Sequence, residues 1–250
     1  MQWARAQMDW KLDSSLFNVA CWRGDLEILK WLRSEGCPWD SRACSYTAQA
    51  GHLEALRWLR SEGCPWNGVS CYDASEHGHF EVLKFLKSEG CPLDTITFCR
   101  AAGNGHLETL KWLRSEGCPW DEGACASAAR NGYFEMLKWL RSEGCPWNTV
   151  TFSSAVKFSK ERSEGDLEIL KWLRRRGCPW SSSACDAAAA CGHLEALKWL
   201  RIEGCPWDEW TCTAAAEGGH LDVLKWAIKN GCRYRVNYET RRALHQLGFI

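Results

Sequence analysis

The chain has 250 residues, with 31 basic and 31 acidic side chains and a formal net charge of zero. This balance excludes a general electrostatic attraction to nucleic acid or to anionic membranes. No apolar run approaches the roughly 18 residues that a membrane span needs, and the N-terminal segment Met1–Arg5 lacks the apolar core of a signal peptide. We therefore predict a soluble, intracellular protein of the cytoplasm or nucleus.

One motif recurs along almost the whole chain. Its Gly-Cys-Pro-Trp box defines a first column of cysteines, meaning cysteines at equivalent positions of successive copies: Cys37, Cys64, Cys91, Cys118, Cys145, Cys178, Cys205 and Cys232. Neighbouring members are 27 residues apart, except for 33 between Cys145 and Cys178. A fixed period in this range is typical of a solenoid, in which each unit buries its apolar face against its neighbours. We predict a single domain over residues 1–250, with a cap at 232–250 and repeats at about 10–36, 37–63, 64–90, 91–117, 118–144, 145–177, 178–204 and 205–231.

Each repeat predicts two helices. In the first repeat they run near Ser15–Trp22 and Asp25–Ser34. In the copy that begins at Cys205, Thr211–Glu217 is a short Ala-rich helix, and apolar residues at three- and four-residue spacing from Leu221 predict an amphipathic second helix. A glycine after the second helix is able to adopt positive φ, and the proline of the box prevents the helix from continuing. An acid near the start of this helix and a base three residues later predict an ion pair.

Three segments depart from the repeat. Met1–Lys11 precedes the first copy as an N-terminal cap, and a polar helix at about Tyr238–Leu247 closes the other end. In the copy at 145–177, Phe158–Gly165 adds six residues to the turn between the helices. We expect a protruding polar loop or a longer first helix there.

Cysteine and tryptophan follow the period. A second cysteine column lies seven residues after the first, at Cys44, Cys71, Cys125, Cys185 and Cys212, and Phe replaces it at Phe17, Phe98 and Phe152. A position that accepts Cys or Phe behaves as buried and apolar. Stacked helices lie about 8–10 Å apart, so equivalent cysteines of adjacent repeats should exceed the roughly 7 Å limit for a disulfide. We interpret the cysteines as reduced and buried, in preference to a disulfide or metal role, and the repeated tryptophans as packing residues.

The motif resembles the ankyrin repeat. The copy at Ala101–Gly117 has the pattern Ala-Ala-x-x-Gly-His-Leu-Glu-x-Leu-Lys-x-Leu-x-x-x-Gly, similar to that repeat from its first helix to its closing glycine, and the pattern recurs in register from about Asp13 to Gly231. The Thr-Pro-Leu-His start is absent, and the residues missing between Asp208 and Cys212 are those that form the projecting β-hairpin finger of the family. The resemblance implies an all-α, ankyrin-like solenoid of about eight stacked antiparallel helix pairs with short, blunt turns and a C-terminal capping helix.

The resemblance also implies a function. We expect a monomeric, non-catalytic scaffold that binds a partner protein through its concave face, without a small-molecule substrate, cofactor, metal or membrane contact. In the family the residues after Ala-Ala face the groove, which here are Trp22, Arg23, Gln49, Glu76, His77, Asn104, Arg130, Asn131, Lys157, Phe158 and Glu217. Turn residues extend this surface at Arg42, Glu122, Glu209 and Trp210. Trp22 and Trp210 are the expected anchors, because tryptophan is enriched in binding hot spots.

Two other functions compete with this interpretation. Basic residues three apart in the second helix, as in Lys111 and Arg114, form a stripe along which repeat proteins can bind RNA. An acid three residues before each first base favours a solvated face instead. Haem ligation by the Cys-Pro thiolates is less favoured, because a repeated turn explains the same residues. Five histidines at the Gly-His step, His52, His79, His106, His193 and His220, are interpreted as hydrogen-bonding residues at the start of the second helix.

Overall fold

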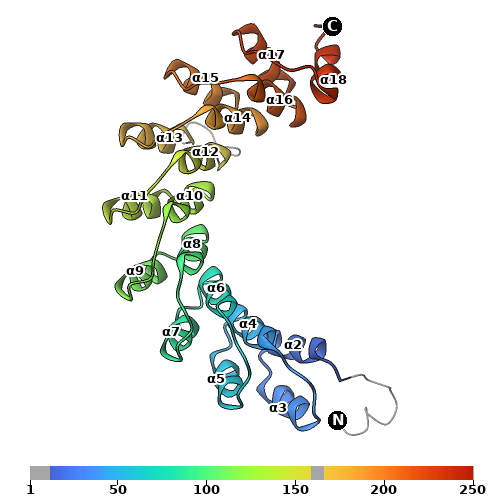
Figure 1. Ribbon diagram of the computed structural model, residues 1–250, viewed down its shortest axis with the longest axis vertical. Helices are drawn as coiled ribbons and strands as arrows, with labels where there is room; N and C mark the ends of the chain where they lie inside the picture. Colours follow the sequence, from blue (N-terminus) through green and yellow to red (C-terminus); the bar gives the residue numbers. More distant parts are fainter. Residues whose placement is uncertain (1–11, 159–165, 250) are drawn as a thin grey trace. The chain divides into compact units, whose positions relative to one another are not determined.

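The computed structural model describes residues 12–158 and 166–249, and every regular element within these ranges is an α-helix (Figure 1). The predicted N-terminal cap and the six-residue insertion lie outside the described residues. The helices group into two compact units, Met1–Pro119 and Trp120–Ile250, which we describe separately as unit 1 and unit 2. That residues 1–250 form a single domain stays a prediction.

Unit 1 is built from helical hairpins. We call the first helix of each hairpin helix A and the second helix B. The helices A are α2 (Ser14–Arg23), α4 (Ser41–Gln49), α6 (Val69–Glu76) and α8 (Thr95–Gly103). The helices B are α3 (Leu26–Ser34), α5 (Leu53–Ser61), α7 (Phe80–Ser88) and α9 (Leu107–Ser115). Successive helices A pack side by side, as do helices A and B of one hairpin (Figure 1).

Unit 2 repeats this construction and ends with a further helix. Its helices A are α10 (Glu122–Arg130), α12 (Thr149–Phe158), α14 (Ser182–Ala190) and α16 (Glu209–Glu217). Its helices B are α11 (Phe134–Ser142), α13 (Asp166–Arg175), α15 (Leu194–Ile202) and α17 (Leu221–Lys229). The last helix, α18 (Tyr238–Gln246), packs on α16 and is stabilised by a capping box between Asn237 and Thr240. The predicted all-α solenoid of paired helices is confirmed. In the described ranges, short turns stand where a β-hairpin finger would project, as predicted.

Local sequence explains where the helices begin and end. An acid two residues after the proline caps helix A, as Asp94 does by accepting a hydrogen bond from the backbone N–H of Thr97 at 3.0 Å. The glycine after helix B adopts positive φ, 84° at Gly231, as predicted. Helix B turns two leucines into the core, such as Leu110 and Leu113, both fully buried. Burying one leucine side chain contributes roughly 2 kcal/mol, so the leucine pair anchors every repeat except the last, where Ala227 of α17 takes the second place. No helix among the described residues has both the length and the apolar character needed to traverse a bilayer.

The Gly-His step joins one repeat to the next. Nε2 of His79 donates a hydrogen bond to the carbonyl of Gln49, 2.8 Å away at the end of the preceding helix A. A Cβ added to Gly51, whose φ is 78°, would lie 2.5 Å from the His79 ring, so only glycine leaves room for the imidazole. The same bond joins His52 to Trp22 and His106 to Glu76. These histidines lie at the start of helix B and form hydrogen bonds, as predicted, but their side chains bond to the preceding repeat and do not cap their own helix.

Candidate functional site on the first helices of the repeats

Helix A turns one stripe of side chains away from helix B. In α4 the stripe consists of Arg42, Tyr46 and Gln49, which lie four and three residues apart and therefore on one face of the helix. We define the helix A face as these three positions in every helix A, together with the residue that directly follows the third position. In unit 1 the other stripes are Ser15, Val19, Trp22; Val69, Asp73, Glu76; and Ile96, Arg100, Gly103. In unit 2 they are Gly123, Ser127, Arg130; Val150, Ser154, Lys157; Ser183, Ala187, Ala190; and Trp210, Ala214, Glu217.

Most predicted residues of unit 1 lie on this face and reach solvent. Trp22 is 59 % exposed, and Arg23, Arg42, His77 and Asn104 are also exposed. Gln49 and Glu76 are half-buried, and their backbone carbonyls accept the histidine hydrogen bonds from the next repeat.

The polar residues of unit 1 are held by neighbours. Arg42 forms an ion pair with the cap residue Asp40 at 2.7 Å, and this hydrogen-bonded guanidinium lowers the pKa of the Asp40 carboxyl. Glu76 and Arg100 pair at 2.8 Å between α6 and α8. Nδ1 of His77 donates a hydrogen bond to the carbonyl of Asp73 at 2.9 Å. The face is therefore organised before any partner arrives.

Burial acts on one carboxyl group of the unit 1 face. The pKa of Asp73 is raised, first because partial burial disfavours the charged form and second because Glu76 lies nearby. His77 and Arg100 oppose this effect. A cationic group beside Asp73 would oppose this effect and lower its pKa.

In unit 2 the predicted residues, except the half-buried Glu209, are exposed, and they lie at the ends of the helices. Trp210 is 56 % exposed at the start of α16, and Glu209 beside it pairs with Arg235 at 3.2 Å. The remaining exposed members are Glu122, Arg130, Asn131, Lys157 and Glu217. Phe158 is 41 % exposed, yet its ring lies over Gly132, where a Cβ would approach it to 2.0 Å. Phe158 thus occupies the place that histidine takes in other repeats, and its part in partner binding stays a prediction.

Several exposed members of the stripes are absent from the residues predicted by the family pattern. Val19 and Tyr46 are 57 % and 37 % exposed, and Val69, Ile96 and Val150, which are equivalent to Arg42 and Trp210, are 43–50 % exposed. These residues could have been found from the helical period, since positions three or four and seven or eight residues before a groove residue share its face. The family pattern instead predicted residues at the ends of the helices.

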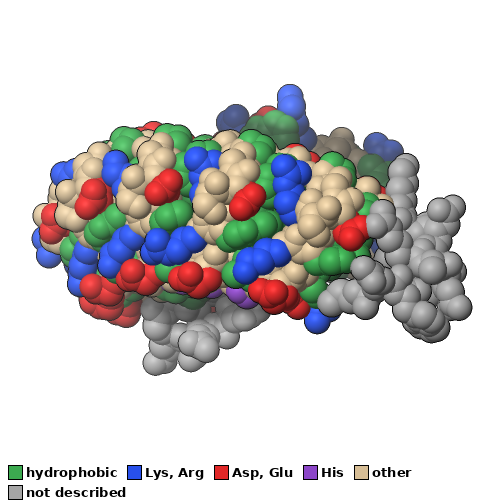
Figure 2. All heavy atoms as spheres, turned by 90° about the horizontal axis from the view of Figure 1, so that it is seen from below, with side chains coloured by type: hydrophobic (Ala, Val, Ile, Leu, Met, Phe, Trp, Pro, Cys, Tyr) green, Lys and Arg blue, Asp and Glu red, His purple; other side chains and the backbone are tan. Residues whose placement is uncertain are grey.

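The outer face of helix B has a different character. A lysine and a glutamate pair three residues apart within one helix, as Lys138 and Glu135 do at 2.7 Å, which confirms the predicted ion pairs. The same pair recurs in α3, α7, α9, α13 and α15. The guanidinium of the second base stacks on the post-proline indole, with Arg60 at 3.9 Å from the ring centroid of Trp66. On the face that Figure 2 displays, basic and acidic side chains are interspersed. The basic stripe is therefore largely neutralised or stacked.

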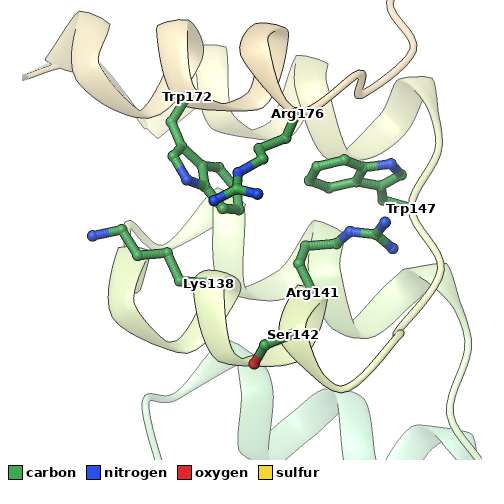
Figure 3. Close-up of a pocket in the computed structure, with 6 residues that line it drawn as sticks. All are labelled: Lys138, Arg141, Ser142, Trp147, Trp172 and Arg176. Atoms are coloured by element: carbon green, nitrogen blue, oxygen red, sulfur yellow. The ribbon is translucent and has the colours of Figure 1, made fainter.

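Two pockets of equivalent construction lie on this side of unit 2. The larger has a volume of about 570 Å³ and is lined by Lys138, Arg141, Ser142, Trp147, Trp172 and Arg176 (Figure 3). Its two indoles meet edge to face with their centroids 5.9 Å apart. The second, of about 440 Å³, is lined by Lys198, Arg201, Ile202, Trp207, Trp226 and Asn230. Arg176 stands where most other repeats have glutamate, so the larger pocket favours an anionic group.

The Cys-Pro thiols point into the core. All sixteen cysteines are free thiols, and all except Cys99 and Cys191 are buried, which confirms the predicted state. Sγ of Cys118 donates to the carbonyl of Asp94 at 3.3 Å. Haem ligation would require such a sulfur to leave the core, so the geometry does not favour this alternative. In the part of the chain that the structure describes, no group of three or more His, Cys, Asp or Glu residues is placed to hold a metal ion.

Comparison with known proteins identifies the fold. No protein-family model matches the chain, and no curated protein sequence matches it. Among solved structures, the ankyrin repeat domain of human ASB11 is similar with a TM-score of 0.52 and 17 % sequence identity, over 65 % of this chain and 84 % of that one. The chain thus has the fold of an ankyrin repeat domain, in agreement with the resemblance of its motif.

Proposed function

We propose that the chain is a non-catalytic scaffold that binds a partner protein through the helix A face, which the ankyrin resemblance makes the concave side. The observation that carries the proposal is the exposure of apolar side chains on this face. Trp22 and Trp210 are more than half exposed, and Val69, Ile96 and Val150 are 43–50 % exposed. Large apolar residues that the core leaves uncovered are typical of interaction surfaces.

A polar rim surrounds these apolar residues. Arg42, Glu76 and Arg100 are held in ion pairs, and His77 is fixed by a hydrogen bond to the backbone. Interfaces commonly combine apolar anchors with such a rim. Because the side chains are already oriented, binding loses little conformational entropy. Recognition by a stacked array also adds contacts along successive repeats.

The proposal is tested by affinity capture from native extract at physiological salt. The chain is compared with a variant in which Trp22, His77, Arg130 and Trp210 are changed to alanine. The matched control changes Ile202 and Tyr238 to alanine, since these side chains are 83 % and 77 % exposed but lie outside the helix A face. We expect a protein that is captured by the chain and by the control and is lost with the fourfold variant. Equal capture by all three would contradict the proposal.

Nucleic acid is the second candidate, and the pocket formed by Lys138, Arg141 and Arg176 is the observation that favours it. The ion pairs along helix B count against it, since they leave little net positive charge for a phosphate backbone. Capture of nuclease-sensitive material with a steep dependence on salt concentration would support this candidate. A monomeric state and an intracellular location remain predictions, the first testable by analytical ultracentrifugation.

A further inference from the structure

The two cysteine columns meet inside the hairpins. Sγ of Cys71, on α6, lies 2.6 Å from Sγ of Cys91, which follows α7. The two residues are 20 positions apart and close one hairpin, from the first turn of helix A to the end of helix B. The same thiol contact joins Cys44 to Cys64, Cys125 to Cys145, Cys185 to Cys205 and Cys212 to Cys232. Distances between cysteines of the same column do not reveal this contact, because it joins one column to the other.

Three hairpins lack the pair and serve as internal controls. Phe17, Phe98 and Phe152 take the second-column position and are fully buried. The first-column thiols of these hairpins, Cys37, Cys118 and Cys178, have no cysteine at the facing position. One chain therefore contains five hairpins with a buried dithiol and three in which an aromatic ring fills the same site.

We propose that the five dithiols are sites of oxidation, each forming a disulfide within its own hairpin when a peroxide reaches it. The thiolate of the first-column cysteine attacks one peroxide oxygen and breaks the O–O bond. The released hydroxide takes up the proton lost by the thiol and leaves as water. The second-column thiol then attacks the resulting sulfenic sulfur, forming the S–S bond and releasing a second water. Both sulfurs are oxidised, and the peroxide is reduced to two water molecules.

The distance between the sulfurs favours a disulfide over a metal bridge. A disulfide bond is about 2.05 Å long, so a separation of 2.6 Å requires only a small movement. Two thiolates bound to one zinc ion at about 2.3 Å each stand well over 3 Å apart. No third metal ligand accompanies any pair within the described residues.

The hydrogen bond between the thiols also assigns their roles. The pKa of Cys91 is lowered, because the Cys71 thiol donates a hydrogen bond to its sulfur. By contrast, burial raises the pKa of Cys118, which faces Phe98, to about 12. The thiolate is the nucleophile in thiol chemistry, so the first-column cysteine of a pair is the attacking group. Both sulfurs of the Cys71–Cys91 pair are buried, so the peroxide reaches them only when the hairpin opens locally.

The experiment oxidises the reduced full-length chain with hydrogen peroxide at neutral pH. Remaining thiols are alkylated after unfolding, and disulfides are located by non-reducing peptide mapping. Five pairs use ten of the sixteen cysteines, so we expect five disulfides and six alkylated residues: Cys21, Cys37, Cys99, Cys118, Cys178 and Cys191. Opening of the hairpins should limit the rate, which therefore levels off as the peroxide concentration rises. Absence of disulfides, or disulfides between other cysteines, would overturn the proposal.

Two variants separate this geometry from general thiol reactivity. Phe98→Cys places a thiol opposite Cys118 and should add a sixth disulfide, between residues 98 and 118. Cys71→Ala should remove only the link to Cys91 and leave that cysteine open to alkylation. Circular dichroism establishes that each variant is folded. A folded Phe98→Cys chain without the new disulfide, or a Cys71→Ala chain in which Cys91 pairs elsewhere, would overturn the proposal as well.

Discussion

The two helices of a repeat pair their surface charges in different ways. On helix B, a base and an acid meet within one helix, as Lys111 and Glu108 do at 2.8 Å, and this pair recurs in most repeats. On helix A, Arg100 reaches Glu76 of the preceding repeat instead. The remaining members of the helix A face differ in chemical type from one repeat to the next. Helix B therefore supplies a uniform solvated surface, and helix A supplies the variation that the proposed recognition of a partner requires.

The largest expected effect is on partner binding. Changing Trp22 and Trp210 to alanine removes two exposed anchors of helix A. We expect the affinity for a captured partner to fall by more than about 30-fold, equivalent to the roughly 2 kcal/mol of a hot spot. The control Ile202→Ala, at the end of helix B, should change it by less than about threefold. Titration calorimetry measures both values, and equal losses would remove the distinction between the helices.

The next effect concerns the glycine that ends each helix. Gly51 follows helix A and Gly63 follows helix B, both with φ of 78°. Alanine at either position costs about 1–2 kcal/mol of backbone strain. At position 51 its Cβ also meets the His79 ring, whereas nothing lies within 4 Å at position 63. We expect Gly51→Ala to lower the free energy of unfolding in urea by about 1 kcal/mol more than Gly63→Ala, the value of a lost hydrogen bond. An equal loss in both variants would show that the histidine contact contributes nothing.

A smaller effect is expected for the ion pairs. Double-mutant cycles should give Lys111 and Glu108 a coupling of about 0.3–0.5 kcal/mol, as for exposed pairs within a helix. Arg100 and Glu76 should couple somewhat more strongly, up to about 1 kcal/mol, because Glu76 is half-buried between two helices. Both couplings should weaken in high salt. A stronger coupling within helix B than between the helices A would reverse the comparison.

The smallest effect is a dependence on pH. Burial lowers the pKa of His79, with nearby His77, His52 and His106 acting in the same direction and the bond to the Gln49 carbonyl opposing them. The folded state then binds this proton less tightly than the unfolded state does, so stability falls as pH drops below the unfolded value of about 6.5. His79→Phe, which copies the placement of Phe158 over Gly132, should remove this part of the loss. Urea unfolding of both chains at pH 7 and about pH 5 measures the difference. An identical pH response in both chains would contradict this role.

Much of the fold follows from the sequence, because proline, glycine and leucine recur with one period. The predicted helix near Ser15–Trp22 is one residue shorter than α2 at each end. The predicted helix near Asp25–Ser34 begins one residue before α3 and ends at the same residue. These boundaries depend on local caps and turns, which a sequence displays directly. The predicted final helix, near Tyr238–Leu247, matches α18 in the same way.

Contacts between distant positions could not be predicted in this way. The period places His79 beside its own helix, but only the structure shows that its ring reaches Gln49, 30 residues earlier. It also shows that Cys71 contacts Cys91 of the other column. The prediction of the helix A face omitted Tyr46 and Val69, although the helical period places both on that face.

The central claim is that partners bind to helix A and not to helix B. Hydrogen–deuterium exchange of the chain, alone and with a captured partner, tests this most directly. We predict slower exchange on binding in α4, α6 and α8 and in the turns after them, with little change on the outer face of α5, α7 and α9. Protection confined to these helices B, or to the helix B pocket around Trp147 and Trp172, would contradict the account.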